Sequence, residues 1–297
     1  MPDLPDYDSP AALKTFLEVR GMAMQKKFGQ NFLVNGTSRQ RLIDALELQE
    51  GQSVWEIGPG LGAMTAGLLT KNINLSVFEI DRGFISVLKD LFSESENFSI
   101  IEGDVLRTWK KAIELKGIPD RFFGNLPYNI AAVIIADTIS AGVRFDRALF
   151  TIQKEVAQRM TAKPGTEDYS SFSVLCQWAY DVAPVMDLAP GCFWPRPNVT
   201  SRAVVLNKKE KWPQCDAPEV FLSLLRGLFS SRRKTVKNNF SAWLALSPYL
   251  PQGGNPDDLA RELLQTAGID PSSRAETFEL QVFLRLADTV YYAGKNK

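Results

Sequence analysis

The sequence predicts an α/β fold, in which a mostly parallel sheet covered by helices on both faces is followed by a small all-helical domain. Short apolar runs alternate with segments of helical periodicity between residues 53 and 153, which is typical of a parallel sheet. A glycine-rich loop at 58–62 follows the first apolar run, as it does where such sheets bind nucleotides. After residue 218 the apolar residues recur only at helical spacing.

The predicted elements begin with a helix and a loop. Ser9-Pro10 before residues 11–19 indicates an N-capped helix with proline in its first turn. Residues 26–35 are expected to form a loop, and apolar residues at helical spacing indicate a helix over 38–48. The alternating elements that follow are strands at 53–57, 75–80, 99–102, 121–124, 148–153 and 203–206, with helices at 63–70, 82–91 and 130–140.

The C-terminal part of the chain is predicted to be helical. Apolar residues recur at positions i, i+3, i+4 and i+7 from Phe221 and again from Leu280. A charged, proline-containing stretch at 207–218 separates these helices from the last strand and predicts a domain boundary. The predicted domains are an N-terminal helical extension at 1–25, a sheet-containing domain at 26–207 and a helical domain at 208–297.

Composition limits the chemistry and the compartment. The chain has 297 residues and no histidine, which excludes a histidine general base and histidine metal ligands. Its three cysteines, Cys176, Cys192 and Cys215, form no C-x-x-C pair, which predicts free thiols and no metal site. Residues 1–8 are acidic and proline-bearing, unlike a signal peptide, and no apolar run approaches the roughly 18 residues of a membrane span. We therefore expect a cytoplasmic protein.

The balance of charge bears on possible partners. Lys and Arg together number 34, as do Asp and Glu, so the formal net charge is zero. Nucleic-acid binders are more often basic, so any such role must rest on local patches. The densest basic patch contains Arg232, Arg233 and Lys234, and a smaller one contains Lys26 and Lys27. Each patch is interpreted either as a set of phosphate contacts or as a solvated face.

The glycine loop fits more than one cofactor. Gly58, Gly60 and Ala63 match the dinucleotide fingerprint, and Glu79 follows about 20 residues later, where an acid binds ribose hydroxyls. Pro59, Gly62 and Glu56 favour S-adenosylmethionine instead, because that cofactor has no pyrophosphate and carries a cationic sulfonium. An ordinary turn between a strand and a helix remains a third interpretation.

Three acidic residues follow predicted strands, where ligands of parallel sheets bind. The carboxylate of Glu79 is placed to accept both ribose hydroxyls of a cofactor. Asp104 is placed to accept a hydrogen bond from the cofactor's adenine amine. The alternative for Asp104 is an N-cap on the next helix, and for Asp81 the N-cap is the favoured interpretation.

The segment Asn125-Leu126-Pro127-Tyr128 is typical of a pocket for an exocyclic amine. The Asn125 side-chain oxygen and the Leu126 carbonyl can both accept hydrogen bonds from an –NH₂ group. Pro127 stiffens the turn, and Tyr128 offers an aromatic face for an extruded base. Phe193 is a candidate for the opposite face, with a core position as the equal alternative. These residues indicate methyl transfer to an adenine.

Six segments of the chain are distinctive as a set: KFGQNFL at 27–33, EIGPGLG at 56–62, GNLPY at 124–128, QKEVAQR at 153–159, FWPRP at 193–197 and SSRRKT at 230–235. Together they resemble the small-subunit ribosomal RNA adenine dimethyltransferases. The resemblance extends from about Lys26 to Ala287, with the segments in the expected order. One departure follows Pro164-Gly165, where the family tends to be basic and this chain has Glu167 and Asp168.

The resemblance implies a Rossmann-like class I methyltransferase domain with a mostly parallel seven-stranded sheet, followed by a small helical domain. It implies dimethylation of the N6 amines of two adjacent adenines near the 3′ end of the small-subunit RNA, with S-adenosylmethionine as cofactor. The implied partner is the small ribosomal subunit and its RNA, and we expect a monomer with no metal and no membrane attachment. Cofactor contacts are implied for Asn31, Leu33, Gly58, Glu79, Asp104 and Asn125.

Three competing interpretations stay open at the level of sequence. The large-subunit RNA methyltransferases that confer macrolide resistance share the glycine loop and a similar Asn-x-Pro-Tyr segment. A ribosome-assembly factor for which methylation is secondary is a second interpretation. A nicotinamide oxidoreductase is a third, although it would leave the Asn125–Tyr128 pocket without a purpose.

Overall fold

The computed structural model describes residues 4–22, 31–126 and 128–295, and the chain divides into two compact units. The first contains Met1–Asp137, Val143–Ala157 and Asp181–Lys208, and the second contains Thr138–Gly142, Gln158–Tyr180 and Lys209–Lys297. Residues 158–180 thus group with the C-terminal helices, whereas the sequence-based limits assign them to the sheet-containing domain. As functional domain limits, 1–25, 26–207 and 208–297 stay a prediction.

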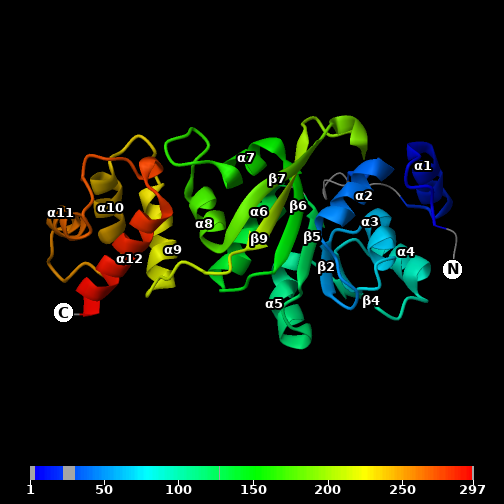
Figure 1. Cartoon of the computed structure of the whole chain (residues 1–297), viewed down its shortest axis with the longest axis horizontal. Coiled ribbons are helices and arrows are strands. Elements are labelled where there is room, and N and C mark those ends of the chain that lie inside the picture. The colour runs from blue at the N-terminus through cyan, green and yellow to red at the C-terminus, as the bar shows by residue number, and fades with distance from the viewer. Residues whose placement is uncertain (1–3, 23–30, 127, 296–297) are drawn as a thin grey trace. The chain divides into compact units, whose positions relative to one another are not determined.

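The first unit is built on a seven-stranded sheet, which confirms the predicted fold class (Figure 1). The strand order is β4-β3-β2-β5-β6-β9-β7. The strands from β4 to β6 pair in parallel, and β9 pairs antiparallel with β6. The strands are β2 Ser53–Ile57, β3 Asn74–Glu79, β4 Phe98–Glu102, β5 Arg121–Asn125, β6 Arg147–Gln153, β7 Tyr180–Leu188 and β9 Ser201–Lys208.

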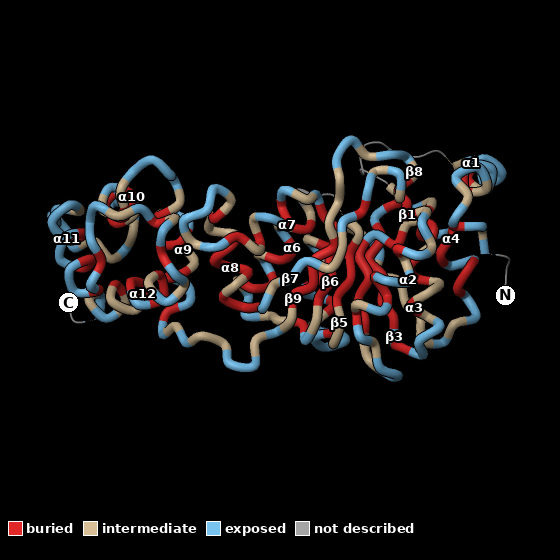
Figure 2. Tube along the Cα trace, turned by 45° about the horizontal axis from the view of Figure 1, so that its top comes forward, coloured by how far each residue is buried: buried red, intermediate tan, exposed pale blue. Residues whose placement is uncertain are grey.

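Burial explains which strands were predictable. The central strands β2, β5 and β6 are buried along most of their length, as Figure 2 shows. The edge strand β7 alternates irregularly between exposed and half-buried residues and contains Pro184, which is tolerated at a sheet edge. Residues 180–188 show no alternation of apolar and polar side chains, so the sequence predicts no strand there.

Part of the predicted loop at 26–35 is a strand. Phe32–Leu33 forms β1, which pairs antiparallel with β8, Phe193–Trp194. The pairing joins segments 160 residues apart in the chain, so no local turn signal announces it. Both Leu33 and Phe193 are buried in the core of the first unit.

The helices of the first unit begin at side-chain caps. Ser9 accepts a hydrogen bond from the Ala12 amide, which confirms the predicted N-cap of the first helix. Asn35 caps the second in the same way, through the Ser38 amide. The helices are α1 Pro10–Val19, α2 Gly36–Ala45, α3 Ala63–Leu69, α4 Arg82–Phe92, α5 Val105–Lys116, α6 Tyr128–Ser140 and α7 Lys154–Thr161, of which the last two continue into the second unit.

The second unit is helical in its described part. Its longest helix, α12, packs against α9, and α10 packs against both α9 and α11. The Tyr169 hydroxyl donates to the Phe278 carbonyl at 2.9 Å and ties the segment before α8 to the C-terminal helices. In the described residues of the whole chain, no helix is long and apolar enough to cross a membrane. The helices are α8 Ser171–Ala179, α9 Pro218–Leu228, α10 Val236–Leu244, α11 Pro256–Thr266 and α12 Leu280–Lys295.

An aromatic cluster stabilises the middle of the sheet. The Phe122 ring is fully buried and lies with its centroid 4.4 Å from that of Phe145, 5.3 Å from that of Phe150 and 6.0 Å from that of Trp55. We expect Phe122→Ala to lower the free energy of unfolding by about 3–5 kcal/mol, because a large cavity would replace the ring. Urea titration measures the change. Leu115→Ala, at a side chain that is 73% exposed, should change it by less than about 0.5 kcal/mol.

Candidate active site

The glycine loop between β2 and α3 is held in a left-handed conformation. Gly58, Gly60 and Gly62 have φ angles of 67°, 58° and 85°, which side chains rarely adopt. A Cβ at Gly60 would lie 2.9 Å from the Phe32 ring, and one at Gly62 would lie 2.6 Å from a ring carbon of Phe92. Glycine is therefore needed both for the backbone and for space. The Gly58 backbone is exposed, so a ligand can approach it closely.

The carboxylate of Glu79 organises this edge of the sheet. Glu79 ends β3 and is buried, yet both its oxygens accept backbone hydrogen bonds. One accepts from the amides of Ile80 and Asp81 at 2.8 and 2.9 Å, and the other accepts from Gly60 at 3.3 Å. Burial raises the pKa of Glu79, and the three amide donors oppose that shift. The oxygen with the single long contact retains capacity for a ligand hydroxyl, which fits a cofactor ribose.

Two further acids cap the helices that follow. Asp81 accepts from the Gly83 amide at 2.8 Å and caps α4, which confirms the favoured interpretation of this residue. Asp104 accepts from the Leu106 amide at 3.0 Å and caps α5, as its alternative predicted. Within the described residues the cap uses only one Asp104 oxygen. The cap therefore leaves the other oxygen for a ligand amine.

Asn125 ends β5 with its amide orientation set by a neighbour. Its Nδ2 donates to the Asn31 carbonyl at 3.2 Å, so its Oδ1 remains the acceptor atom of the group. The Leu126 amide donates to the Thr151 carbonyl at 3.3 Å, and the Leu126 side chain lies over Gly58. The predicted amine pocket and the glycine loop are therefore adjacent. Pro127 and the side chain of Tyr128 lie outside the described residues.

The β1–β8 pair supports the same edge. Leu33 lies opposite Phe193 in the register, and the Phe32 ring stacks on Trp194 with centroids 6.0 Å apart. Phe193 is 5% exposed and belongs to the core, so stacking of its ring on a base stays a prediction. Contacts among the glycine loop, β1, β3 and β5 bring five of the predicted cofactor residues to one edge of the sheet, namely Asn31, Leu33, Gly58, Glu79 and Asn125.

Glu56 lies beneath the glycine loop rather than in it. Its side chain is 2% exposed and accepts a hydrogen bond from the Thr65 hydroxyl at 2.7 Å. Burial, with a smaller contribution from the charge of Glu79, raises the pKa of Glu56 to about 8. At neutral pH the group is therefore mostly protonated, so it supplies no full charge to a sulfonium.

In the predicted basic patch, Arg232 makes internal contacts, whereas Arg233 and Lys234 form no ion pair with a described residue. Arg232 forms an ion pair with Glu276 at 2.8 Å and also donates to the Glu167 carbonyl. Arg233 and Lys234 are exposed, and no ion pair joins either of them to another described residue. Lys26 and Lys27 lie outside the described residues.

Two supporting residues escaped the sequence interpretation. The Tyr7 hydroxyl donates to the Leu61 carbonyl in the glycine loop at 2.8 Å, and Arg39 donates to the Leu33 carbonyl at 2.8 Å. Tyr7 lies 54 residues before Leu61 in the chain, and Tyr7 belongs to none of the motifs found in the sequence. Only the folded chain brings them together.

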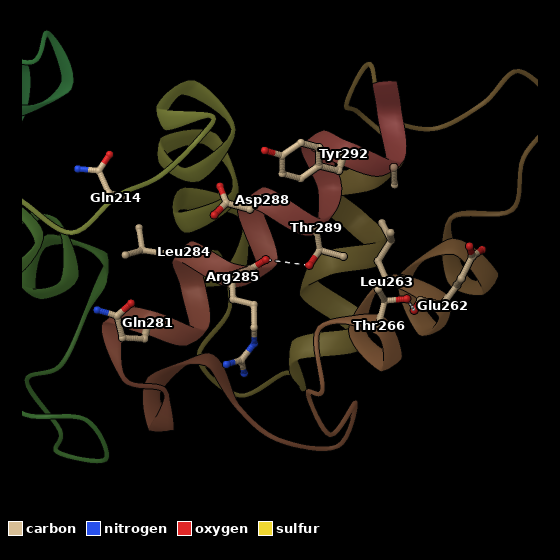
Figure 3. Close-up of a pocket in the computed structure, with 11 residues that line it drawn as sticks. Gln214, Glu262, Leu263, Thr266, Gln281, Leu284, Arg285, Asp288, Thr289 and Tyr292 are labelled. Atoms are coloured by element: carbon tan, nitrogen blue, oxygen red, sulfur yellow. Dashed lines mark hydrogen bonds between the residues drawn. The ribbon is translucent and has the colours of Figure 1, made fainter. Parts of the chain in front are cut away.

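A pocket of about 710 Å³ lies within the C-terminal unit, between α11, α12 and the segment before α9 (Figure 3). Glu262, Arg285 and Asp288 contribute charges of both signs to its lining, together with apolar Leu263 and Leu284. None of the residues predicted to bind the cofactor or the target base lines it. It is therefore separate from the candidate site at the sheet edge.

The sheet order, the glycine loop and the acid at the end of β3 are those of a class I methyltransferase. A family model described as ribosomal RNA adenine dimethylase matches residues 21–246. A Treponema denticola protein named ribosomal RNA small subunit methyltransferase A is 48% identical over 96% of both chains. A protein of the same name from Anoxybacillus flavithermus is 34% identical over 96% of this chain and 97% of its own length. The chain belongs to the ribosomal RNA adenine dimethylase family.

Solved structures agree with this assignment. A dimethyladenosine transferase from Plasmodium falciparum superposes with a TM-score of 0.72 and 27% identity, over 85% of this chain and 94% of that one. The 23S rRNA methyltransferase ErmE superposes with a TM-score of 0.59 and 21% identity, over 87% and 99%, which shows a shared fold.

The raised pKa of Glu56 generates a prediction about stability. Between pH 4.5 and about 8, Glu56 is protonated in the folded protein but ionised in the unfolded chain. Its stabilising contribution is complete below pH 4.5 and is lost as the pH rises to about 8. We expect Glu56→Gln to become more stable relative to the natural protein as pH rises through this window, by up to about 1.4 kcal/mol per pH unit. Urea titrations of both proteins at pH 5 and 7.5 test it, and parallel pH profiles would contradict it.

Proposed function

We propose that this chain dimethylates the N6 amines of two adjacent adenines near the 3′ end of small-subunit ribosomal RNA, as a step in ribosome biogenesis. The observation that carries the proposal is the fixed amide of Asn125, whose nitrogen is bound to Asn31 and whose oxygen is left to accept. The names of the relatives point to the same substrate. The acceptor atom lies beside a loop suited to the methyl donor.

The site residues fit S-adenosylmethionine. Glu79 offers an oxygen for the ribose hydroxyls, and Asp104 offers one for the adenine amine. The exposed Gly58 backbone and the strand at Leu33 complete the proposed set with Asn31 and Asn125. When bound, S-adenosylmethionine supplies an electrophilic methyl group on its sulfonium.

The chain's part in the reaction is to activate a weak nucleophile. The adenine amine is weak because its lone pair is delocalised into the ring. Asn125 Oδ1 and the Leu126 carbonyl accept its two hydrogens and favour a pyramidal nitrogen whose lone pair is free. These hydrogen bonds strengthen as positive charge develops on nitrogen, so they stabilise the transition state more than the ground state. The cationic product loses its proton to water, and no histidine is required.

Double methylation constrains the same pocket. After the first transfer the amine has one hydrogen left, so only one of the two acceptors can remain bound to it. Two acceptors from different groups, a side-chain amide and a backbone carbonyl, allow either one to serve the second transfer. Tyr128 is proposed to stack on the extruded base, with Phe193 on its other face after a local rearrangement of the β1–β8 pair.

The exposed arginine and lysine of the basic patch are proposed to bind RNA phosphates. Arg233 and Lys234 are available for this, whereas Arg232 is held by Glu276 and orders the loop at 166–167. The partner is the small ribosomal subunit, and we propose that a monomer acts on it in the cytoplasm. A binding role in assembly is compatible with this activity, because subunit binding and methyl transfer use different residues.

Asn125→Ala should slow methyl transfer by about 10²-fold or more while leaving the fold intact. The variant loses one of the two groups proposed to accept hydrogen bonds from the amine in the transition state. Single-turnover methylation of purified small subunits measures it. The matched control is Asn74→Ala, because that amide donates to the Gly51 carbonyl at 2.9 Å at the opposite end of the same sheet. Near-normal turnover by the Asn125 variant would exclude the proposed role.

The division of the basic patch predicts unequal effects on RNA binding. Neutralising Arg233 and Lys234 to Gln should weaken binding and make the slope of log affinity against log salt shallower by roughly 1 to 2, because two phosphate contacts are lost. Neutralising exposed Lys110 and Lys111 on α5 makes the same charge change elsewhere and should leave the slope unaltered. Equal slopes for both double variants would count against phosphate contacts at this patch.

A further inference from the structure

We infer that residues 4–22, here termed the N-terminal clasp, set the affinity of the cofactor loop, with Tyr7 and Arg39 as positioning residues. This rests on the proposed function, because it concerns the methyl-donor site. The clasp contains α1 and precedes the six sequence segments that begin at Lys27. It nevertheless contacts three separate parts of the cofactor edge.

The first contact is made by the Tyr7 hydroxyl, which donates to the Leu61 carbonyl at 2.8 Å. Leu61 lies between Gly60 and Gly62, which both have positive φ angles, so its carbonyl orientation determines the course of the loop. Tyr7 is 8% exposed, and among the described residues no other group donates to this carbonyl. Loss of the hydroxyl would leave a buried carbonyl unsatisfied.

The second contact passes through Arg39 on α2. One guanidinium nitrogen donates to the Leu33 carbonyl at 2.8 Å and to the Tyr7 carbonyl at 3.4 Å, and the other donates to Asp8 at 2.7 Å. The planar guanidinium therefore binds the clasp and β1 at the same time. Leu33 is a proposed cofactor contact, so the clasp and the cofactor site share one supporting group.

The third link is apolar. Leu13 and Leu17 of α1 are buried in the same hydrophobic core cluster as Phe32, Leu61 and Phe92. Phe32 and Phe92 lie against Gly60 and Gly62 of the glycine loop.

The clasp also reaches the helix after Glu79. Met22 lies against Gly83 in the first turn of α4. A Cβ atom at position 83 would lie only 2.8 Å from the Met22 methyl carbon. The clasp thus contacts the loop, β1 and α4. Because an ordered clasp favours the loop conformation that binds the donor, clasp order and donor binding should strengthen each other.

Tyr7→Phe tests the inference, since it removes only one oxygen and keeps the ring in the core. We expect the Kd for S-adenosylmethionine to rise about fivefold to tenfold, which corresponds to one buried hydrogen bond. At saturating donor, kcat should stay within about twofold, because the amine acceptors are untouched. Isothermal titration with S-adenosylmethionine and initial-rate methylation of small subunits provide the two values.

The matched control is Tyr169→Phe in the C-terminal unit. It also removes a buried tyrosine hydroxyl from a backbone carbonyl, at 2.9 Å, but far along the chain from the loop. Both variants should lose similar stability, and only Tyr7→Phe should lose donor affinity. The inference would be overturned if the Tyr7 variant bound the donor with the natural Kd. It would also be overturned if the Tyr169 variant lost as much donor affinity as the Tyr7 variant. Failure of the natural protein itself to bind the donor would instead overturn the proposed function.

Discussion

The candidate site depends on one buried carboxylate. Glu79 ends β3 and binds three backbone amides, one of which belongs to Gly60 in the loop after β2. Because β2 and β3 are neighbouring parallel strands, this carboxylate fixes the loops that follow them relative to each other. The cost of burying the carboxyl group is offset by these donors. With the loop fixed, the exposed Gly58 backbone lies beside Leu126, and the two are proposed to flank the methyl donor and the target amine.

The chain contains no histidine, so the proposed reaction uses other groups. In that proposal an amide oxygen and a backbone carbonyl accept the two hydrogens of the adenine amine, and neither acceptor carries a charge that would be costly to desolvate. The proposed reaction therefore depends on the orientation of the Asn125 amide. The Asn31 carbonyl supplies it by binding the nitrogen end of the group.

The basic side chains of the second unit differ in whether they make internal contacts. A neutral chain that binds RNA needs local positive charge, but not every basic side chain in a patch can contribute it. Arg232 is held by Glu276 and by the backbone carbonyls of Thr166 and Glu167. Among the side chains proposed to bind phosphate, this leaves Arg233 and Lys234, which are exposed.

The sequence by itself determined the parallel core of the sheet, the glycine loop, the caps at Ser9 and Asp81, and the family. These features depend on local periodicity, backbone conformation and residue type, all of which are readable over a few positions. Tertiary structure alone decided the edge strand β7, the β1–β8 pair, the burial of Glu56 and Phe193, and the hydrogen bonds of Tyr7 and Arg39 to the cofactor edge. Each of these depends on contacts between residues distant in sequence, or on an irregular edge strand that carries no apolar alternation. Their free energies arise from packing and desolvation, which no local pattern encodes.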